Sequence, residues 1–325
     1  MLEPSPNRSP RSRLLRFGAA FVVLLAVAGY VAVQYVTGGA GAPGCRVVSG
    51  DDDGATYEFT PEQAVNAATI TAVGTARNLP ERAVTIALAT ALQESALRNI
   101  DYGDRDSLGL FQQRPSQGWG SAEEIMDPAY SAGEFYEHLV EVPGYTRLPL
   151  TVAAQRVQRS GFPQAYAKHE PDATLLAAAL TGRSGATLTC DGRPGATRAK
   201  GPDAVRAALV RDFGRDVLQP LGAEVGASAD SSPAPSASAS GGSGGRTVTL
   251  PVGDGPGTGE DAERRGWQLA HWAVANASSL HIERVAYAGR QWTAGNTDSK
   301  WYPVGGGSSH GAERAPGPVR ITSAR

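Results

Sequence analysis

The chain has 325 residues, which is enough for one large domain or two ordinary ones. Its formal net charge is −2, and its 30 Lys and Arg are scattered apart from a cluster at the N-terminus. These values give no electrostatic case for nucleic acid as a partner, so we expect none.

The N-terminus carries the pattern of a membrane anchor. Residues 1–13 form a basic polar tail, and residues 14–37 contain an uncharged apolar run from Phe17 to Val36. At about 1.5 Å per residue a helix of this run is roughly 30 Å long, the thickness of a bilayer core. The basic flank predicts an N-terminus in the cytoplasm and a single-pass chain whose remainder lies outside. A cleaved signal peptide is the alternative, because residues 40–42 read Ala-Gly-Ala, and the chain would then be secreted.

The two cysteines are Cys45 and Cys190, and neither stands in a CxxC or Cys/His spacing. This argues against a structural zinc site, and export would allow the two thiols to oxidise. A bridge would tie together the ends of the region 45–190 and stabilise it by up to about 4–5 kcal/mol. We expect this disulfide, and two unpaired thiols are the alternative.

The region between the cysteines is predicted to be helical. Thr60 and Pro61 predict the start of a helix that runs to about Arg77, and Asn78 with Glu81 predicts a second helix that ends near Arg98. Residues 108–112 form a short strand or the wall of a cleft. Later helices are expected at 128–140, 149–159, 172–180 and 202–213. Strand signal is sparse, so the domain 45–190 is predicted to be mainly α, with a helical extension to residue 221.

A composition change separates a second module. Between residues 222 and 245, 21 of 24 residues are Gly, Ala, Ser or Pro, which predicts a flexible linker over 222–246. Residues 247–325 then predict a small α+β accessory domain. Its elements are a strand at 247–250, an amphipathic helix at 261–279, and strands at 282–292 and 318–322.

The most informative stretch runs from Ala83 to Leu97, where Glu94 is the only ionisable side chain. A helix that is apolar or small on all sides is normally buried all round. Lost hydration and the negative end of the helix dipole both raise the pKa of such a carboxyl group. A carboxyl group held protonated near neutral pH is what a general acid requires. A structural Glu hydrogen-bonded to the following loop is the alternative from these residues alone.

Two short motifs carry a family resemblance. Gln93-Glu94-Ser95 and the Ser-Leu-Gly-Leu-Phe-Gln stretch at 107–112 resemble the lysozyme-like superfamily, closest to soluble lytic transglycosylases and goose-type lysozymes. The longer string YGDRDSLGLFQQRPSQGW is similar to exported actinobacterial proteins that carry such a domain. The resemblance covers roughly residues 60–190. Residues 158–160 and 165–166 stand where these enzymes have an Ala-Tyr-Asn-type motif and depart from it.

The resemblance implies cleavage of β-1,4 glycosidic bonds in peptidoglycan, with Glu94 protonating the leaving oxygen. A hydrolase needs a second carboxylate, for which Asp101, Asp104 and Asp106 are the candidates and Asp106 is favoured. Lytic transglycosylases need none, because a hydroxyl of the sugar attacks and the same Glu acts as acid and then base. Both outcomes stay open. The departure from the Ala-Tyr-Asn pattern keeps open a further alternative, a wall-binding scaffold without turnover.

Other residues are candidates for supporting roles. Ser95 is expected to orient Glu94 or a substrate amide, and Gln112 and Gln113 offer amides suited to N-acetyl groups. Trp119 and Tyr136 are the aromatic residues expected to stack on sugar faces. Core packing is the alternative for both rings, as for Tyr130, Tyr145 and Tyr166. No cofactor is expected.

The C-terminal module resembles a domain of secreted proteins that is distantly related to zinc peptidases with a His-x-His ligand pair. The matching end here reads Pro-Val-Arg-Ile-Thr at 318–322, so the pair is missing. His271, His281 and His310 remain, in a spacing of no recognised metal type. We therefore expect no metal and a binding or positioning role, with a zinc peptidase or amidase as the alternative.

Together these observations predict a mainly α (α+β) lysozyme-like domain with an N-terminal transmembrane helix, followed by a small α+β C-terminal domain. The expected partners are peptidoglycan strands and, through the N-terminal helix, the membrane.

Overall fold

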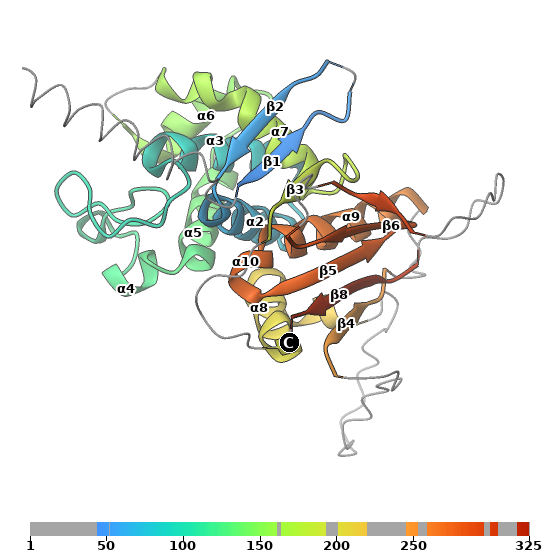
Figure 1. Cartoon of the computed structure of the whole chain (residues 1–325). Helices are drawn as coiled ribbons and strands as arrows, with labels where there is room; N and C mark the ends of the chain where they lie inside the picture. Colours follow the sequence, from blue (N-terminus) through green and yellow to red (C-terminus); the bar gives the residue numbers. More distant parts are fainter. Residues whose placement is uncertain are drawn as a thin grey trace, which may run out of the picture. The chain divides into compact units, whose positions relative to one another are not determined.

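The fold is taken from a computed structural model, shown in Figure 1. It describes residues 44–51, 53–160, 164–192, 201–219, 245–252, 259–295, 300–304 and 317–324. The chain divides into two units, Met1–Ala42 and Pro43–Arg325, and every described residue belongs to the second. The predicted anchor at 14–37, most of the predicted linker and His310 lie outside the described residues.

Helices form most of the first half of the second unit. Their bounds are α2 (Pro61–Ala76), α3 (Glu81–Ser95), α4 (Ala122–Ile125), α5 (Pro128–Val140), α6 (Leu150–Gln158), α7 (Glu170–Leu180) and α8 (Gly201–Phe213). Short 3₁₀ turns cover 115–117, 165–169 and 215–218. These bounds confirm the predicted helices to within about two residues, apart from the end of α3. That helix ends three residues before Arg98, because Ala96 and Leu97 both take left-handed backbone.

The cap of α2 shows why the local sequence was informative. The Thr60 hydroxyl accepts a hydrogen bond from the Gln63 N–H, and the Gln63 side chain accepts one from the Thr60 N–H. This reciprocal pair satisfies two backbone donors at the helix start. Pro61 occupies the first turn, where its missing N–H costs no hydrogen bond.

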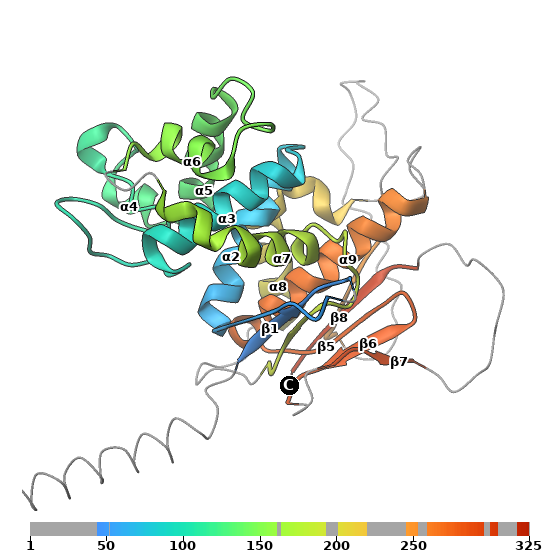
Figure 2. The same ribbon diagram turned by 90° about the horizontal axis from the view of Figure 1, so that it is seen from above.

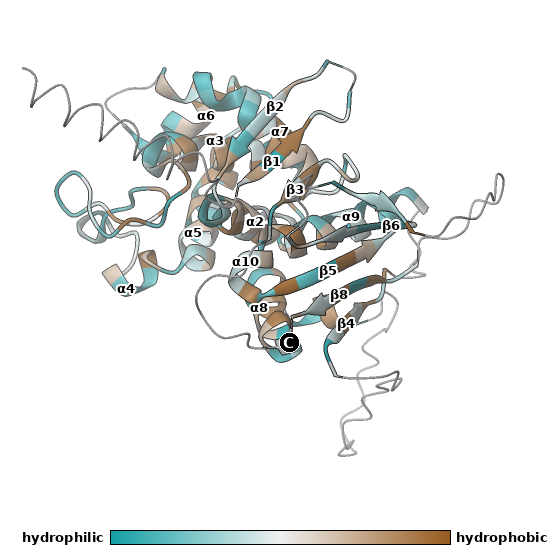
Figure 3. Cartoon of the chain, viewed as in Figure 1, coloured by the Kyte–Doolittle hydropathy of each residue, from teal (hydrophilic) through white to brown (hydrophobic). Residues whose placement is uncertain are grey.

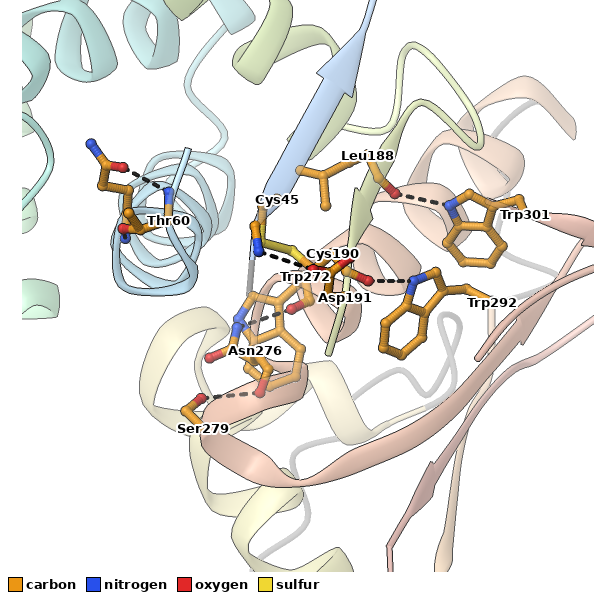
Figure 4. The surroundings of a disulfide bond; sticks show 12 residues. Cys45, Thr60, Leu188, Cys190, Asp191, Trp272, Asn276, Ser279, Trp292 and Trp301 are labelled. Atoms are coloured by element: carbon orange, nitrogen blue, oxygen red, sulfur yellow. Dashed lines mark hydrogen bonds between the residues drawn. A yellow bond between two sulfur atoms is a disulfide. The ribbon is translucent and has the colours of Figure 1, made fainter. Parts of the chain in front are cut away.

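A small antiparallel sheet closes the helical region. Its strands are β1 (Cys45–Val48), β2 (Thr56–Phe59) and β3 (Leu188–Cys190), in the order β2-β1-β3. Cys45 lies directly opposite Cys190 in the register, and the two form the predicted disulfide. Figure 4 shows this bond between the two strands. The bond therefore joins the first and last strands of the 45–190 region.

The C-terminal residues form a second sheet with one long helix against it. The elements are β4 (Thr247–Leu250), α9 (Gly259–Ala275), α10 (Ala277–Leu280), β5 (Ile282–Tyr287), β6 (Arg290–Thr293), β7 (Tyr302–Pro303) and β8 (Val319–Ser323). The sheet is antiparallel, in the order β4-β8-β5-β6-β7. Figure 2 shows α9 running alongside it. Figure 3 shows hydrophilic and hydrophobic blocks along β5, whose Ile282, Val285 and Tyr287 are buried and whose register shifts between Ile282 and Arg284.

Helix α9 packs on two sides at once. It contacts β5 and β8 of its own sheet, and also α2, α7 and β3 of the helical region. Every residue from Gly266 to Ala275 is buried, so the second half of this helix has no exposed face. The predicted amphipathic helix at 261–279 is instead split into α9 and α10.

Tryptophan side chains tie the C-terminal elements to the helical region. The indole N–H of Trp292 donates to the Cys190 carbonyl at 3.0 Å, and that of Trp301 donates to the Leu188 carbonyl at 2.9 Å (Figure 4). The indole N–H of Trp272 donates to the buried Asp212 carboxylate at 2.8 Å. One continuous hydrophobic core therefore runs from the first sheet through α9 to the second sheet.

The predicted fold class is wrong. The described chain is a mixed α/β structure with two antiparallel sheets, and it is not the mainly α domain that was predicted. The three strands of the first sheet were missed because they have only three or four residues each, too few for a clear alternating pattern. Among the described residues no helix is long and apolar enough to cross a membrane.

Candidate active site

Glu94 lies in the last turn of α3, as predicted, and its side chain is half-buried. Burial raises the pKa of Glu94 above its ordinary value, while hydrogen bonds from Tyr166 and Gln158 lower it in part. Burial is the larger of these effects, because the carboxylate loses hydration that two hydrogen bonds do not replace. The raised pKa favours the protonated form that a general acid needs.

Tyr166 is a direct polar partner of Glu94. Its hydroxyl donates a hydrogen bond of 2.7 Å to Glu94 Oε1, and the tyrosine is fully buried. Burial also raises the pKa of Tyr166 well above its ordinary value, so this hydroxyl stays a donor at neutral pH. Tyr166 belongs to the 3₁₀ turn at 165–169, which contacts α3. The arrangement fixes one oxygen of the Glu94 carboxyl group.

The loop after α3 is anchored to the end of the helix. The Ser95 hydroxyl lies 2.8 Å from the Leu110 carbonyl oxygen, to which it donates, and it also accepts the Arg98 N–H at 3.2 Å. On the other side, the Gln158 side chain donates to the Phe111 carbonyl at 2.7 Å. The predicted wall at 108–112 thus forms a turn held between α3 and α6, closed by a bridge between Leu108 and Gln113. The hydrogen bonds of the Ser95 hydroxyl therefore go to the backbone of α3 and of this loop.

Asp106, the favoured second carboxylate, has other partners. Its carboxylate pairs with Arg114 at 2.7 Å and accepts the Ser116 N–H at 2.9 Å. Hydrogen bonds from Ser116 and Arg114 hold the pKa of Asp106 far below its usual range. Asp101 and Asp104 are exposed in the same loop. Asp106 therefore acts as a clamp within the loop in this structure.

A groove of about 530 Å³ opens beside this site. Its walls come from the loop after α3, the α5–α6 connection and the end of α6. The lining residues are Gln112, Gln113, Arg114, Gln117, Gly118, Trp119, His138, Glu141, Val142, Pro143, Arg156, Val157, Gln158 and Arg159. Gln158 connects the groove to the acid, because the same side chain hydrogen-bonds Glu94. Three of the predicted binding residues, Gln112, Gln113 and Trp119, line this groove.

These residues differ in how much they offer to a ligand. Gln112 is half-buried, and its amide lies 3.3 Å from the Tyr102 and Gly109 carbonyls. Trp119 is half-buried and packs against the His138 ring, with 4.3 Å between centroids. Gln113 is 2% exposed and donates to the Ser131 carbonyl at 2.9 Å, so its side chain mainly fixes the loop to α5.

Tyr136 is placed away from the groove. It is fully buried, and its hydroxyl donates to the Ile70 carbonyl at 3.0 Å. In this position the ring packs against α2, where Gly74 leaves room for it. The structure thus gives this ring a packing role between α5 and α2.

The histidines of the C-terminal elements do not form a cluster. Among the described residues no group of three His, Cys, Asp or Glu side chains is arranged to hold a metal ion. His271 is fully buried, with Nδ1 2.7 Å from the Ala179 carbonyl oxygen. Burial lowers its pKa to about 4, so the ring is neutral and Nδ1 carries the proton.

Comparison with protein families gives a match in the C-terminal part of the chain. The family described as VldE, C-terminal domain, matches residues 229–314, which include α9, α10 and the strands β4 to β7. The match begins within the predicted linker and covers the predicted accessory domain in part. No curated protein matches the chain.

Sequence analysis did not predict that Tyr166 and Gln158 hydrogen-bond to Glu94. Tyr166 was a candidate only for sugar stacking, and Gln158 only part of a motif that departs from the expected pattern. Tyr166 is 72 residues from Glu94 in the sequence, so local pattern could not bring them together. One indication of their role was present in the sequence, because both residues lie in the stretches that stand where related enzymes have the Ala-Tyr-Asn-type motif.

Proposed function

We propose that this chain cleaves the glycan strands of peptidoglycan, with Glu94 as the general acid. The observation that carries the proposal is the half-buried Glu94 carboxyl group, whose pKa burial raises and whose Oε1 Tyr166 orients at 2.7 Å. The Gln93-Glu94-Ser95 and 107–112 motifs, which resemble the lysozyme-like superfamily, supply the class of substrate. The disulfide fits a location in an oxidising compartment outside the cytoplasm, where peptidoglycan is found.

In the proposed reaction, protonated Glu94 donates its proton to the glycosidic oxygen as the bond between that oxygen and the anomeric carbon breaks. The leaving sugar departs as an alcohol, and positive charge develops on the ring that remains. The new Glu94 carboxylate is stabilised by the hydrogen bonds that Tyr166 and Gln158 already provide. These two donors therefore favour the proton-transfer step.

The second step is proposed to be transglycosylation. A hydroxyl of the same sugar attacks the anomeric carbon, and the Glu94 carboxylate takes up the proton of that hydroxyl. This route needs no second carboxylate. The clamp of Asp106 on Arg114 and Ser116 supports it, because Asp106 is thereby occupied in holding the loop.

Replacement of Glu94 by Gln tests the proposal, because it keeps the shape and removes the transferable proton. The full chain and the Glu94→Gln variant are incubated with purified peptidoglycan, and soluble fragments are identified by mass spectrometry. We expect 1,6-anhydro ends from the unmodified chain and a loss of at least about 100-fold in the variant. The matched control is Glu62→Gln, an exposed glutamate in the first turn of α2.

Each other outcome contradicts part of the proposal. Reducing ends in place of anhydro ends would refute transglycosylation and establish hydrolysis. Fragments released equally by Glu94→Gln would refute the role of the acid. If the unmodified chain sediments with peptidoglycan but releases no soluble product, the result would refute cleavage and favour a wall-binding scaffold.

A further inference from the structure

A pocket separate from the groove beside Glu94 lies where α9 meets the helical region. Its volume is about 590 Å³, within the usual range for small-molecule sites. Its walls come from the end of α2 and the turn into α3, the end of α7, the 3₁₀ turn at 215–218 with the end of α8, and α9. The pocket shares no lining residue with the groove, so it is a second candidate site.

Arg265 of α9 supplies a fixed cation to this pocket. Its guanidinium carbon lies 5.0 Å from the centre of the Phe213 ring, and its Nη1 donates to Gln268 Oε1 at 2.8 Å. Gln268 Nε2 in turn donates to the Thr75 hydroxyl on α2 at 2.6 Å. The guanidinium is therefore held in place, while its Nε and Nη2 have no hydrogen-bond partner among the described residues.

Arg265 is half-buried without a counter-charge. Across the described ranges, no carboxylate lies within ion-pair distance of it. Burial lowers the pKa of Arg265, but a guanidinium stays charged at neutral pH. A charge that has lost hydration is stabilised by an opposite charge. Arg265 is thus suited to bind an anion that enters the pocket.

The other charged side chains of the pocket are paired, apart from Asp216. Arg264 pairs with Asp261 at 2.7 Å, and Glu81 pairs with Arg183 at 2.9 Å. Asp216 is exposed in the 3₁₀ turn at 215–218, and no cation of the described chain lies within ion-pair distance of its carboxylate. One unpaired cation and one unpaired anion therefore line the same pocket, too far apart to pair with each other.

We propose that this pocket binds a small zwitterion, a free amino acid or a short peptide, with its carboxylate on Arg265 and its ammonium on Asp216. The N–H groups of a guanidinium match the two oxygens of a carboxylate, and the Asp216 carboxylate accepts hydrogen bonds from an ammonium. Phe213 and Val217 offer apolar contacts to the rest of the ligand. The site does not involve Glu94, so the inference goes beyond the proposed function and holds whether or not the chain cleaves glycan strands.

The test measures equilibrium binding to the full chain by NMR titration. The probes are L-alanyl-L-alanine, its N-acetylated form and its C-terminal amide. We expect the amide to bind at least about tenfold more weakly than the free dipeptide, because it lacks the group that pairs with Arg265. The acetylated form should bind about threefold to fivefold more weakly, because Asp216 is exposed and its interaction is screened by water. Alanine and trialanine show whether the pocket prefers an amino acid or a peptide.

Two variants locate the binding. Arg265→Gln should reduce affinity for the free dipeptide at least about tenfold. Asp216→Asn should bind the free and the acetylated dipeptide equally, and its exposed position makes a folding defect unexpected. The matched control is Asp203→Asn on α8, which is exposed and does not line the pocket. Should Arg265→Gln fail to fold, Asp216→Asn decides the outcome.

Three results would overturn the inference. The first is no binding of alanine, dialanine or trialanine by the unmodified chain. The second is equal affinity of that chain for the free and the two blocked dipeptides. The third is tighter binding of the acetylated dipeptide by Asp216→Asn, which would mean that Asp216 pairs with Arg265 in solution. Each is read without glycan cleavage, so a failure here is distinct from a failure of the proposed function.

Discussion

The hydrogen bond from Tyr166 to Glu94 allows a specific pH experiment. Tyr166→Phe removes the hydroxyl that lies 2.7 Å from Glu94 Oε1 and keeps the buried ring. The ionised carboxylate loses a donor, whereas the protonated carboxyl loses much less. The pKa of Glu94 therefore rises further above its ordinary value, and the acid form persists to higher pH.

The size of the effect follows from the kind of bond. A hydrogen bond to a charged group contributes about 1.5–3 kcal/mol, and the lower end applies because Glu94 is only half-buried. About 1.5 kcal/mol changes the ratio of protonated to ionised Glu94 roughly tenfold at a fixed pH. Gln158 remains as a donor to the carboxylate and keeps the effect from being larger.

The assay is the pH profile of fragment release from peptidoglycan. Activity is expected to fall as pH rises through the pKa of Glu94, and in Tyr166→Phe this alkaline limb should move to higher pH. Tyr57→Phe is the matched control, because it removes the same hydroxyl group from a tyrosine outside the site. Tyr57 lies on β2, where its ring stacks on Phe59. A limb that stays in place, or moves to lower pH, would refute the assignment of Tyr166 as a stabiliser of the carboxylate.

Three predictions concern stability, each measured by urea unfolding. Replacing Cys45 and Cys190 by Ala opens a loop with a sequence separation of 145 and should lower the free energy of unfolding by up to about 4–5 kcal/mol. Asp212→Ala removes the buried carboxylate that pairs with Arg211 and accepts the Trp272 indole N–H, and should cost about 3 kcal/mol. His271 has a pKa of about 4 when folded and about 6.5 when unfolded, so between these values the unfolded chain binds more protons. Stability should fall by up to about 3 kcal/mol as pH drops from 6.5 to 4, and His271→Gln should lack this part of the decrease.

Each of these has its own control. Equal urea midpoints for the oxidised chain and the cysteine variant would contradict the contribution of the disulfide. The exposed Asp203, which pairs with Arg206 on α8, serves as the control for Asp212, and equal losses for Asp203→Ala and Asp212→Ala would contradict the buried network. For His271, the same pH dependence in the unmodified chain and the variant would place the titrating group elsewhere.

Local sequence was sufficient wherever short-range interactions decide structure. Helices α2 and α5 start where predicted. Their cap residues, Thr60 and Asp127, bond to backbone N–H groups two or three residues ahead, and Pro61 occupies the first turn of α2. Glu94 was identifiable for a related reason. One charge in an otherwise apolar helix implies a desolvated carboxyl group, and the structure gives it a raised pKa through burial.

Short strands and the packing of α9 needed the tertiary structure. Alternation over three or four residues does not distinguish a strand from a loop, so β1 and β3 were missed although Cys45 and Cys190 within them were paired correctly. The run Gly266–Ala275 was predicted to lie within an amphipathic helix over 261–279, which would have one exposed face. Its burial on all sides comes from two layers that meet there, the second sheet and the helices α2 and α7.

The helices, the disulfide and the desolvated carboxyl group of Glu94 could be predicted from the sequence, because each depends on nearby residues or on a residue type in an unusual setting. The groups that face this carboxyl group are set by tertiary packing. Tyr166 reaches Glu94 across 72 residues, and Gln158 joins it to the groove from a third helix. The same packing places Arg265 of α9 and Asp216 of the 3₁₀ turn at 215–218 in one pocket. Such contacts arise from the packing of separate elements, for which a single sequence carries no local signal.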